Sequence, residues 1–144
     1  MDLIEQAREE LKRADHLIYI SLKYTRTCDI IMNTVKRLVE SCDFVILALL
    51  EKFKERRKSL SIPENSLSRA ELLVSLDKKY KSHIKLYLLL CKIRDSEFDR
   101  REEYRKHVTM IVHLERRSLE VTVPILEEYY FSIKDFVDTA EGEI

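Results

Sequence analysis

Residues 28–58 read CDIIMNTVKRLVESCDFVILALLEKFKERRK, and this stretch decides the fold. Its apolar side chains recur at steps that alternate between three and four residues, the spacing that lines one face of an α-helix. The stripe comprises Cys28, Ile31, Val35, Leu38, Cys42, Val45 and Leu49. No proline or glycine interrupts it. We therefore predict a single long helix from Cys28 to Lys58.

The middle of this helix, from Phe44 to Leu50, is apolar on every side. A helix of this kind must be covered all round. The apolar segment is shorter than the roughly 20 residues that a membrane span needs, so we expect no membrane association. We interpret the stretch as the central helix of a bundle, with a second subunit as a further partner for its surface.

The N-terminal segment predicts a first helix that packs against the long one. It runs from Asp2 to about Tyr24, and Asp2 and Glu5 have the spacing of a capping box. Thr25 or Thr27 can cap the long helix that follows. Because the joint between the two helices is short, they should lie antiparallel.

A third helix is predicted after the loop at residues 59–68. Ser68 and Glu71 have capping-box spacing, so the helix should begin there. Its apolar stripe continues to Ile93 or Arg94, where we expect it to end. Within this helix His83 is flanked by aromatic residues, and we predict a packed histidine with one hydrogen bond.

The region from Asp95 to Val123 has a different pattern. It is almost entirely charged up to Lys106, and apolar residues then alternate from 108 to 114 and from 119 to 123. Alternation with many β-branched residues favours a small β-hairpin. The spacing from Tyr104 to Ile111 also fits a fourth helix, and this alternative stays open.

Pro124 follows the alternating region and suits the first turn of a final helix. The predicted fold is therefore mainly α, an antiparallel four-helix bundle with a small β-hairpin before the last helix. With 144 residues, the chain should form a single helical-bundle domain, 1–144.

Charge and composition narrow the classes of function. Lys and Arg together number 26, as do Asp and Glu, which argues against binding to nucleic acid through bulk charge. No basic segment followed by an apolar one opens the chain, so we expect no signal peptide and a cytoplasmic location. Many charged residues with few amides are a tendency of thermophile proteins.

The three cysteines lack the spacing of a metal site. Cys28 and Cys42 lie on the apolar stripe and Cys91 lies beside another one, so we expect small buried hydrophobic residues. No Cys-x-x-Cys pair or Cys/His pairing is present. We therefore expect no metal and no cofactor.

The segment from Arg100 to His107 holds the strongest candidate for chemistry. It reads RREEYRKH and joins several guanidinium groups to an imidazole. Arginine matches the oxygens of a phosphate, and histidine can move a proton near neutral pH. Such a set suits phosphodiester cleavage without a metal. A solvated charged segment with a surface histidine is the plainer interpretation.

At these residues the chain resembles the HEPN superfamily, the helical domains named for higher eukaryote and prokaryote nucleotide binding. The motif of that family is an Arg, four to six further residues, and a His. Arg101 and His107 fit it with five residues between them, and Arg100 fits with six. The order of the helices is also similar. The resemblance implies a bundle that is often dimeric and in many members a metal-independent ribonuclease.

The resemblance also implies roles for individual residues. His107 would act as base or acid on a ribose 2′-hydroxyl, Arg101 would stabilise charge on the phosphorane, and Tyr104 could orient His107. Arg100, Arg105 and Lys106 are the candidates for contacts with RNA. A nucleotidyltransferase-type protein is the partner that the resemblance suggests.

Two functions therefore stay open. One is a toxin-like ribonuclease with an Arg/His pair at a dimer cleft. The other is a homodimeric interaction module that keeps the bundle, using the tyrosines and residues 44–50 for self-association. Active family members often carry Asn directly after the Arg, whereas Glu102 follows Arg101 here. This difference favours the interaction module.

Overall fold

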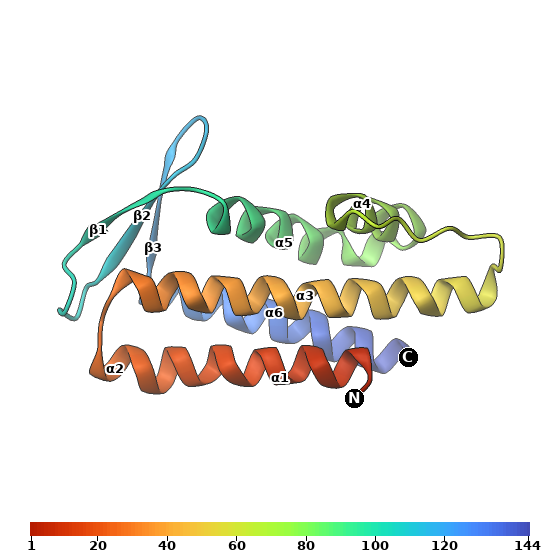
Figure 1. Cartoon of the computed structure of the whole chain (residues 1–144), viewed down its shortest axis with the longest axis horizontal. Coiled ribbons are helices and arrows are strands. Elements are labelled where there is room, and N and C mark those ends of the chain that lie inside the picture. Colours follow the sequence, from red (N-terminus) through yellow and green to blue (C-terminus); the bar gives the residue numbers. More distant parts are fainter.

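The long helix predicted from the sequence is present as α3, Cys28–Arg56, in the computed structural model, which describes residues 1–144. The chain is mainly helical, with one small antiparallel sheet at one end (Figure 1). α3 lies between α1 (Leu3–His16) and α5 (Lys81–Arg94), and α6 (Val123–Glu143) packs along a third side (Figure 1). The helix that is apolar all round is thus the central one.

The first helical segment ends where the sequence predicted. Asp2 caps α1 by accepting a hydrogen bond from the Glu5 N–H at 2.8 Å, and the side chain of Glu5 accepts from the Asp2 N–H, which completes the capping box. α1 continues through a π-helical turn, η1 (Leu17–Ser21), into α2 (Leu22–Tyr24). Thr27, rather than Thr25, then caps α3 by accepting from the Ile30 N–H at 3.4 Å.

The predicted third helix differs from the structure at its start. The helix there is α4 (Ser66–Leu76), and Asn65 caps it by accepting from the Ser68 N–H at 3.1 Å. Ser68 therefore lies inside the first turn, so the capping box predicted for Ser68 and Glu71 is wrong. Asn65 is as good an N-cap as a serine and lies three residues earlier.

The predicted third helix is also broken in the middle. Asp77 is extended, with φ −150° and ψ 105°, and its carboxylate accepts from the Lys79 N–H at 3.1 Å. A single 3₁₀ turn, η2 (Lys78–Tyr80), then leads into α5. The apolar spacing conceals this break, because Leu73 and Tyr80 lie seven residues apart, are both buried, and would share one face of an unbroken helix.

The sheet has three strands rather than the two of a hairpin. β2 (Thr109–His113) pairs with β3 (Ser118–Thr122), and β1 (Phe98–Arg101) pairs with the other edge of β2. These strands exclude the alternative helix at residues 104–111. β1 was missed because it is an edge strand of sequence FDRR, of which only Phe98 is half-buried. Thr122 caps α6, and Pro124 lies in its first turn as predicted.

One core of 35 buried residues joins the helices to the inner face of the sheet. Between Phe44 and Leu50 five residues are buried, and only Phe44 and Leu47 remain half-buried. The chain itself therefore supplies most of the cover that this segment requires. Cys28 and Cys42 are fully buried as predicted, whereas Cys91 is half-buried, and all three are free thiols. No helix has the length and apolar character for a membrane crossing.

We expect Leu38→Ala to lower the free energy of unfolding by about 2–5 kcal/mol, because it leaves a cavity beside the central helix. Leu38 is 0% exposed. Leu47→Ala is the matched control, since Leu47 lies on the same helix and is half-buried, and its loss should be clearly smaller. Urea unfolding followed by circular dichroism measures both. Equal losses would contradict the placement of Leu38 in the core.

Candidate functional site

The predicted motif lies in β1 and in the loop that follows it, and this loop closes over the N-terminus of α3. The backbone N–H of Tyr104 donates to the carbonyl oxygen of Arg26 at 2.7 Å. Glu102 and Tyr104 have positive φ angles of 54° and 68°, a conformation that side chains other than glycine adopt seldom. The loop therefore makes a tight, strained turn against the junction of α2 and α3.

Arg100 binds the first turn of α3. Its two terminal nitrogens donate to the two carboxylate oxygens of Asp29 at 2.8 and 2.9 Å, and Nη1 also donates to Glu103 at 3.2 Å. Glu103 in turn accepts from the Cys28 N–H at 2.9 Å, one of the backbone donors that a helix start leaves without a partner. The hydrogen bonds from Arg100 lower the pKa of the Asp29 carboxyl. Arg100 thus fastens the sheet to the helix.

Arg101 points to the opposite face of the sheet. It pairs with Thr109 in the register of β1 and β2, and its guanidinium makes an ion pair with Glu120 on β3. Arg101, which the resemblance expects to stabilise the charge on the phosphorane, is therefore already paired with a carboxylate. No hydrogen bond or ion pair joins it to His107.

The rest of the motif is exposed. Tyr104, Arg105, Lys106 and His107 all lie in the loop, and none of their side chains makes a hydrogen bond or ion pair within the chain. His107 lies two residues before β2, which starts at Thr109. The structure therefore places the predicted residues in one loop without assembling them into a bonded catalytic set.

A second group of residues adjoins this loop and was not singled out from the sequence. Tyr24 is 85% exposed and Tyr104 is 76% exposed, and the loop bonds to Arg26, two residues after Tyr24. We call the combined surface the tip patch, and it comprises Lys23, Tyr24, Arg26, Tyr104, Arg105, Lys106 and His107. The sequence signal is present in residues 23–26, which carry Lys23, Arg26 and a tyrosine, although the pattern from Tyr24 to Thr27 by itself indicates only a joint between two helices.

None of the four lysine and arginine side chains in the tip patch has an ion-pair partner. Glu102 is the one carboxylate beside them that also has no ion-pair partner. Asp29 and Glu103, the other carboxylates nearby, share the single positive charge of Arg100, so together with Glu102 they leave two negative charges against the four positive ones. The tip patch is therefore positively charged although the chain as a whole is neutral.

A row of polar side chains crosses the outer face of the sheet. His113 lies between Asp99, at 2.8 Å from its Nε2, and Ser118, at 3.5 Å from its Nδ1. These are the residue types of a hydrolase triad. All three are exposed, so the row lacks the enclosed, oriented setting that activates a serine.

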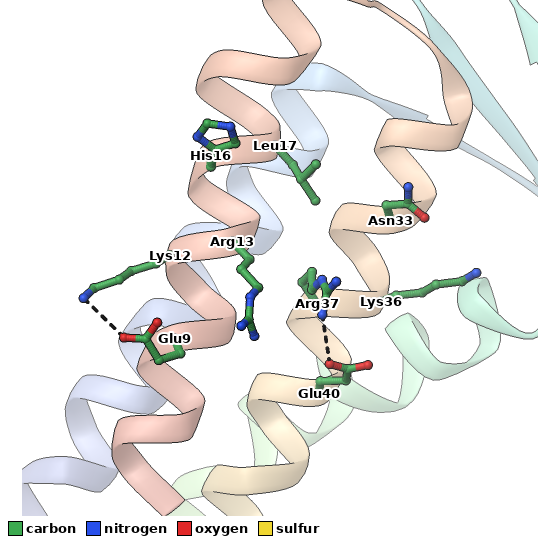
Figure 2. Close-up of a pocket in the computed structure, with 9 residues that line it drawn as sticks. All are labelled: Glu9, Lys12, Arg13, His16, Leu17, Asn33, Lys36, Arg37 and Glu40. Carbon is green, nitrogen blue, oxygen red and sulfur yellow. Dashed lines mark hydrogen bonds and ion pairs between the residues drawn. The ribbon is translucent and has the colours of Figure 1, made fainter. Parts of the chain in front are cut away.

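A polar groove of about 540 Å³ lies at the surface between α1 and α3 (Figure 2). Beneath it the buried Glu10 binds Arg13 at 2.5 Å and Arg37 at 3.2 Å. Burial, together with the charge of Glu10, raises the pKa of the Glu40 carboxyl. Arg13 is directed into the groove, whereas Lys12 and Lys36 point away from it (Figure 2). These ion pairs join two helices, and few of the cations remain available to a ligand.

His83 is a packed histidine, as predicted from the sequence. Its Nε2 lies 2.8 Å from Asp135, its only hydrogen-bond partner, and its ring stacks on Phe136 with centroids 5.0 Å apart. No group of three or more His, Cys, Asp or Glu side chains in the chain is arranged to hold a metal ion.

Comparisons with protein-family models, with curated proteins and with solved structures give no match to this chain. A proposal on its function therefore rests on the residues and geometry described above.

We expect Asp29→Asn to lower the unfolding temperature by a few degrees at pH 7. The pKa of Asp29 is lower in the folded chain than its ordinary 3.8, so the carboxylate stabilises the fold above that pH. This contribution is lost as the pH falls through the lowered pKa. The difference between the variant and the wild type should therefore vanish in acid. Glu102→Gln, a neighbour without a partner, is the control and should leave the unfolding temperature unchanged at every pH.

Proposed function

We propose that this chain is a HEPN-like four-helix bundle, in which α4 and α5 together take the place of the third helix, and that it binds RNA rather than cleaving it. The observation that carries this proposal is the tip patch, where two exposed tyrosines lie among four lysine and arginine side chains without ion-pair partners. The three free thiols suit a reducing compartment, and we place the function in the cytoplasm.

Exposed aromatic rings on a basic surface suit single-stranded RNA. Every base has a flat face that can stack on a tyrosine, and each such contact contributes about 1–3 kcal/mol. The lysine and arginine side chains of the patch attract the phosphate backbone over short distances. This attraction does not require a high net charge on the whole protein. Tyr24 and Tyr104 come from different segments, so a strand of RNA would cross the junction between them.

The ion pairs that the two motif arginines make with carboxylates favour RNA binding over RNA cleavage. Arg100 is occupied by Asp29 and Glu103, and Arg101 by Glu120. A guanidinium must be free to face the phosphate if it is to stabilise the charge that develops in the transition state. Within one chain neither arginine is free in this way.

Replacement of both exposed tyrosines, Tyr24→Ala with Tyr104→Ala, should weaken binding of a single-stranded RNA about tenfold or more, because two stacking platforms are lost. Fluorescence anisotropy with a labelled oligonucleotide measures this affinity. Phe131→Ala is the matched control, since Phe131 is 57% exposed on α6, outside the patch, and it should bind as the wild type does. Equal affinity for all three proteins would contradict the proposal.

A metal-independent ribonuclease is the second candidate, and the exposure of His107 beside Tyr104 favours it. In a dimer, two such loops could complete each other. The same oligonucleotide, incubated with the protein and a chelator, should stay intact if the chain only binds. Cleavage that is lost in both His107→Ala and Arg101→Ala would establish the second candidate in place of the first.

We also propose that the chain forms a homodimer, and a nucleotidyltransferase-type protein remains the further partner that the resemblance suggests. Phe44 and Leu47 are the residues of the apolar segment that stay half-buried. Light scattering should give twice the chain mass of 17.2 kDa, and Leu47→Lys should halve that value by placing a charge in the contact. A monomeric wild type, or an unchanged mass for the variant, would count against this surface.

A further inference from the structure

A second groove lies on the side of α3 opposite to α1. Its volume is about 1090 Å³. The start of α4, the C-terminal half of α5 and the turn between β2 and β3 line it, and all three lie on the same side of α3 (Figure 1). We call it the α5 groove. It is separate from the tip patch, because the two loops of the sheet leave β2 at opposite ends.

Apolar side chains that remain partly exposed line the α5 groove. Leu67, in the first turn of α4, is 52% exposed. Leu88 and Cys91 on α5 and Leu114 at the end of β2 are half-buried and also line it. These residues come from three separated segments, and each leaves apolar surface in contact with water. Together they form an apolar floor in the groove.

The edge of the groove is positively charged. Lys92, Arg116 and Arg117 are exposed there and make no ion pair. Arg94 is paired with Asp95 at 2.9 Å, so these two charges cancel. Glu115 is the one lining carboxylate without a partner. The groove therefore combines an apolar floor with a rim that attracts negative charge.

We propose that the α5 groove binds an amphipathic helix of a partner protein, with an apolar stripe for the floor and acidic residues for the rim. A helix laid in a groove matches this combination, and the complementary charges fix its orientation. RNA fits less well, because the only aromatic ring in the lining, Tyr87, is 1% exposed and donates its hydroxyl to Asp43 at 2.5 Å. The site extends the function beyond the tip patch and does not depend on it.

Cys91 provides a reporter inside the groove. Cys28 and Cys42 are 0% exposed, whereas Cys91 is half-buried in the lining. A thiol reagent therefore reaches Cys91 alone in the folded chain. Burial raises the pKa of the Cys91 thiol, so the labelling is carried out in mildly alkaline buffer, where more of the thiolate is present.

The probe is a helical peptide of about 14 residues, with leucines along one face and glutamates along both flanks. A saturating amount should slow alkylation of Cys91 about tenfold, because it covers the groove. The double variant Arg116→Glu with Arg117→Glu should bind the peptide about tenfold or more weakly, since the rim then repels it. Both substitutions lie in an exposed turn, so the fold should not change.

Two controls distinguish the α5 groove from the tip patch and an acidic peptide from a basic one. Tyr104→Ala, in the tip patch, should bind the peptide as the wild type does, and the charge-reversed variant should keep its affinity for RNA. The same peptide with lysines in place of glutamates should not protect Cys91. The proposal is overturned if the acidic peptide fails to protect Cys91, if the charge-reversed variant binds it equally well, or if single-stranded RNA protects Cys91 instead.

Discussion

The N-terminus of α3 is held by Arg100 of β1 and by Glu103 of the loop that follows β1, and these contacts fix the position of that loop. Glu103 accepts the Cys28 N–H, and Arg100 bridges Glu103 to Asp29. The sheet has three strands of at most five residues each, and packing against helices adds to the stability of so small a sheet. Its inner face packs into the helical core through Met110 and Val112, and the ion pairs fix its edge strand.

Strand β2 separates the two surfaces that we assign to binding. Because β2 is joined to β1 at one end and to β3 at the other, the loop at residues 102–108 and the turn at 114–117 lie at opposite ends of one short strand. The loop bonds to Arg26, just after α2, and the turn lines the same groove as α5. A ligand on one surface therefore leaves the other accessible.

Much of the helical part could be predicted from the sequence, because apolar spacing and N-caps are local signals. The capping box at Asp2, the start of α3 after Thr27 and Pro124 in the first turn of α6 were all legible in this way. The break at Asp77 was not, since the stripe continues across it. β1 was not either, because an edge strand buries so little that a charged sequence can form it.

The geometry of the candidate site could be predicted from the sequence even less than the break at Asp77 or strand β1. An Arg followed at a set distance by a His is a statement about spacing along the chain, and it says nothing about where each side chain points. In a strand, neighbouring residues face opposite sides. Arg100 therefore turns inward, over the ring of Phe98 and toward α3, while Arg101 turns outward to Glu120. Arg101 offsets the charge of Glu120, and Arg100 offsets one of the two charges of Asp29 and Glu103. The lysines and arginines at positions 23, 26, 105 and 106 therefore outnumber the negative charges that remain near them. Whole-chain neutrality conceals this local excess, because a ligand responds to charges within about 8–10 Å and not to the sum over the molecule.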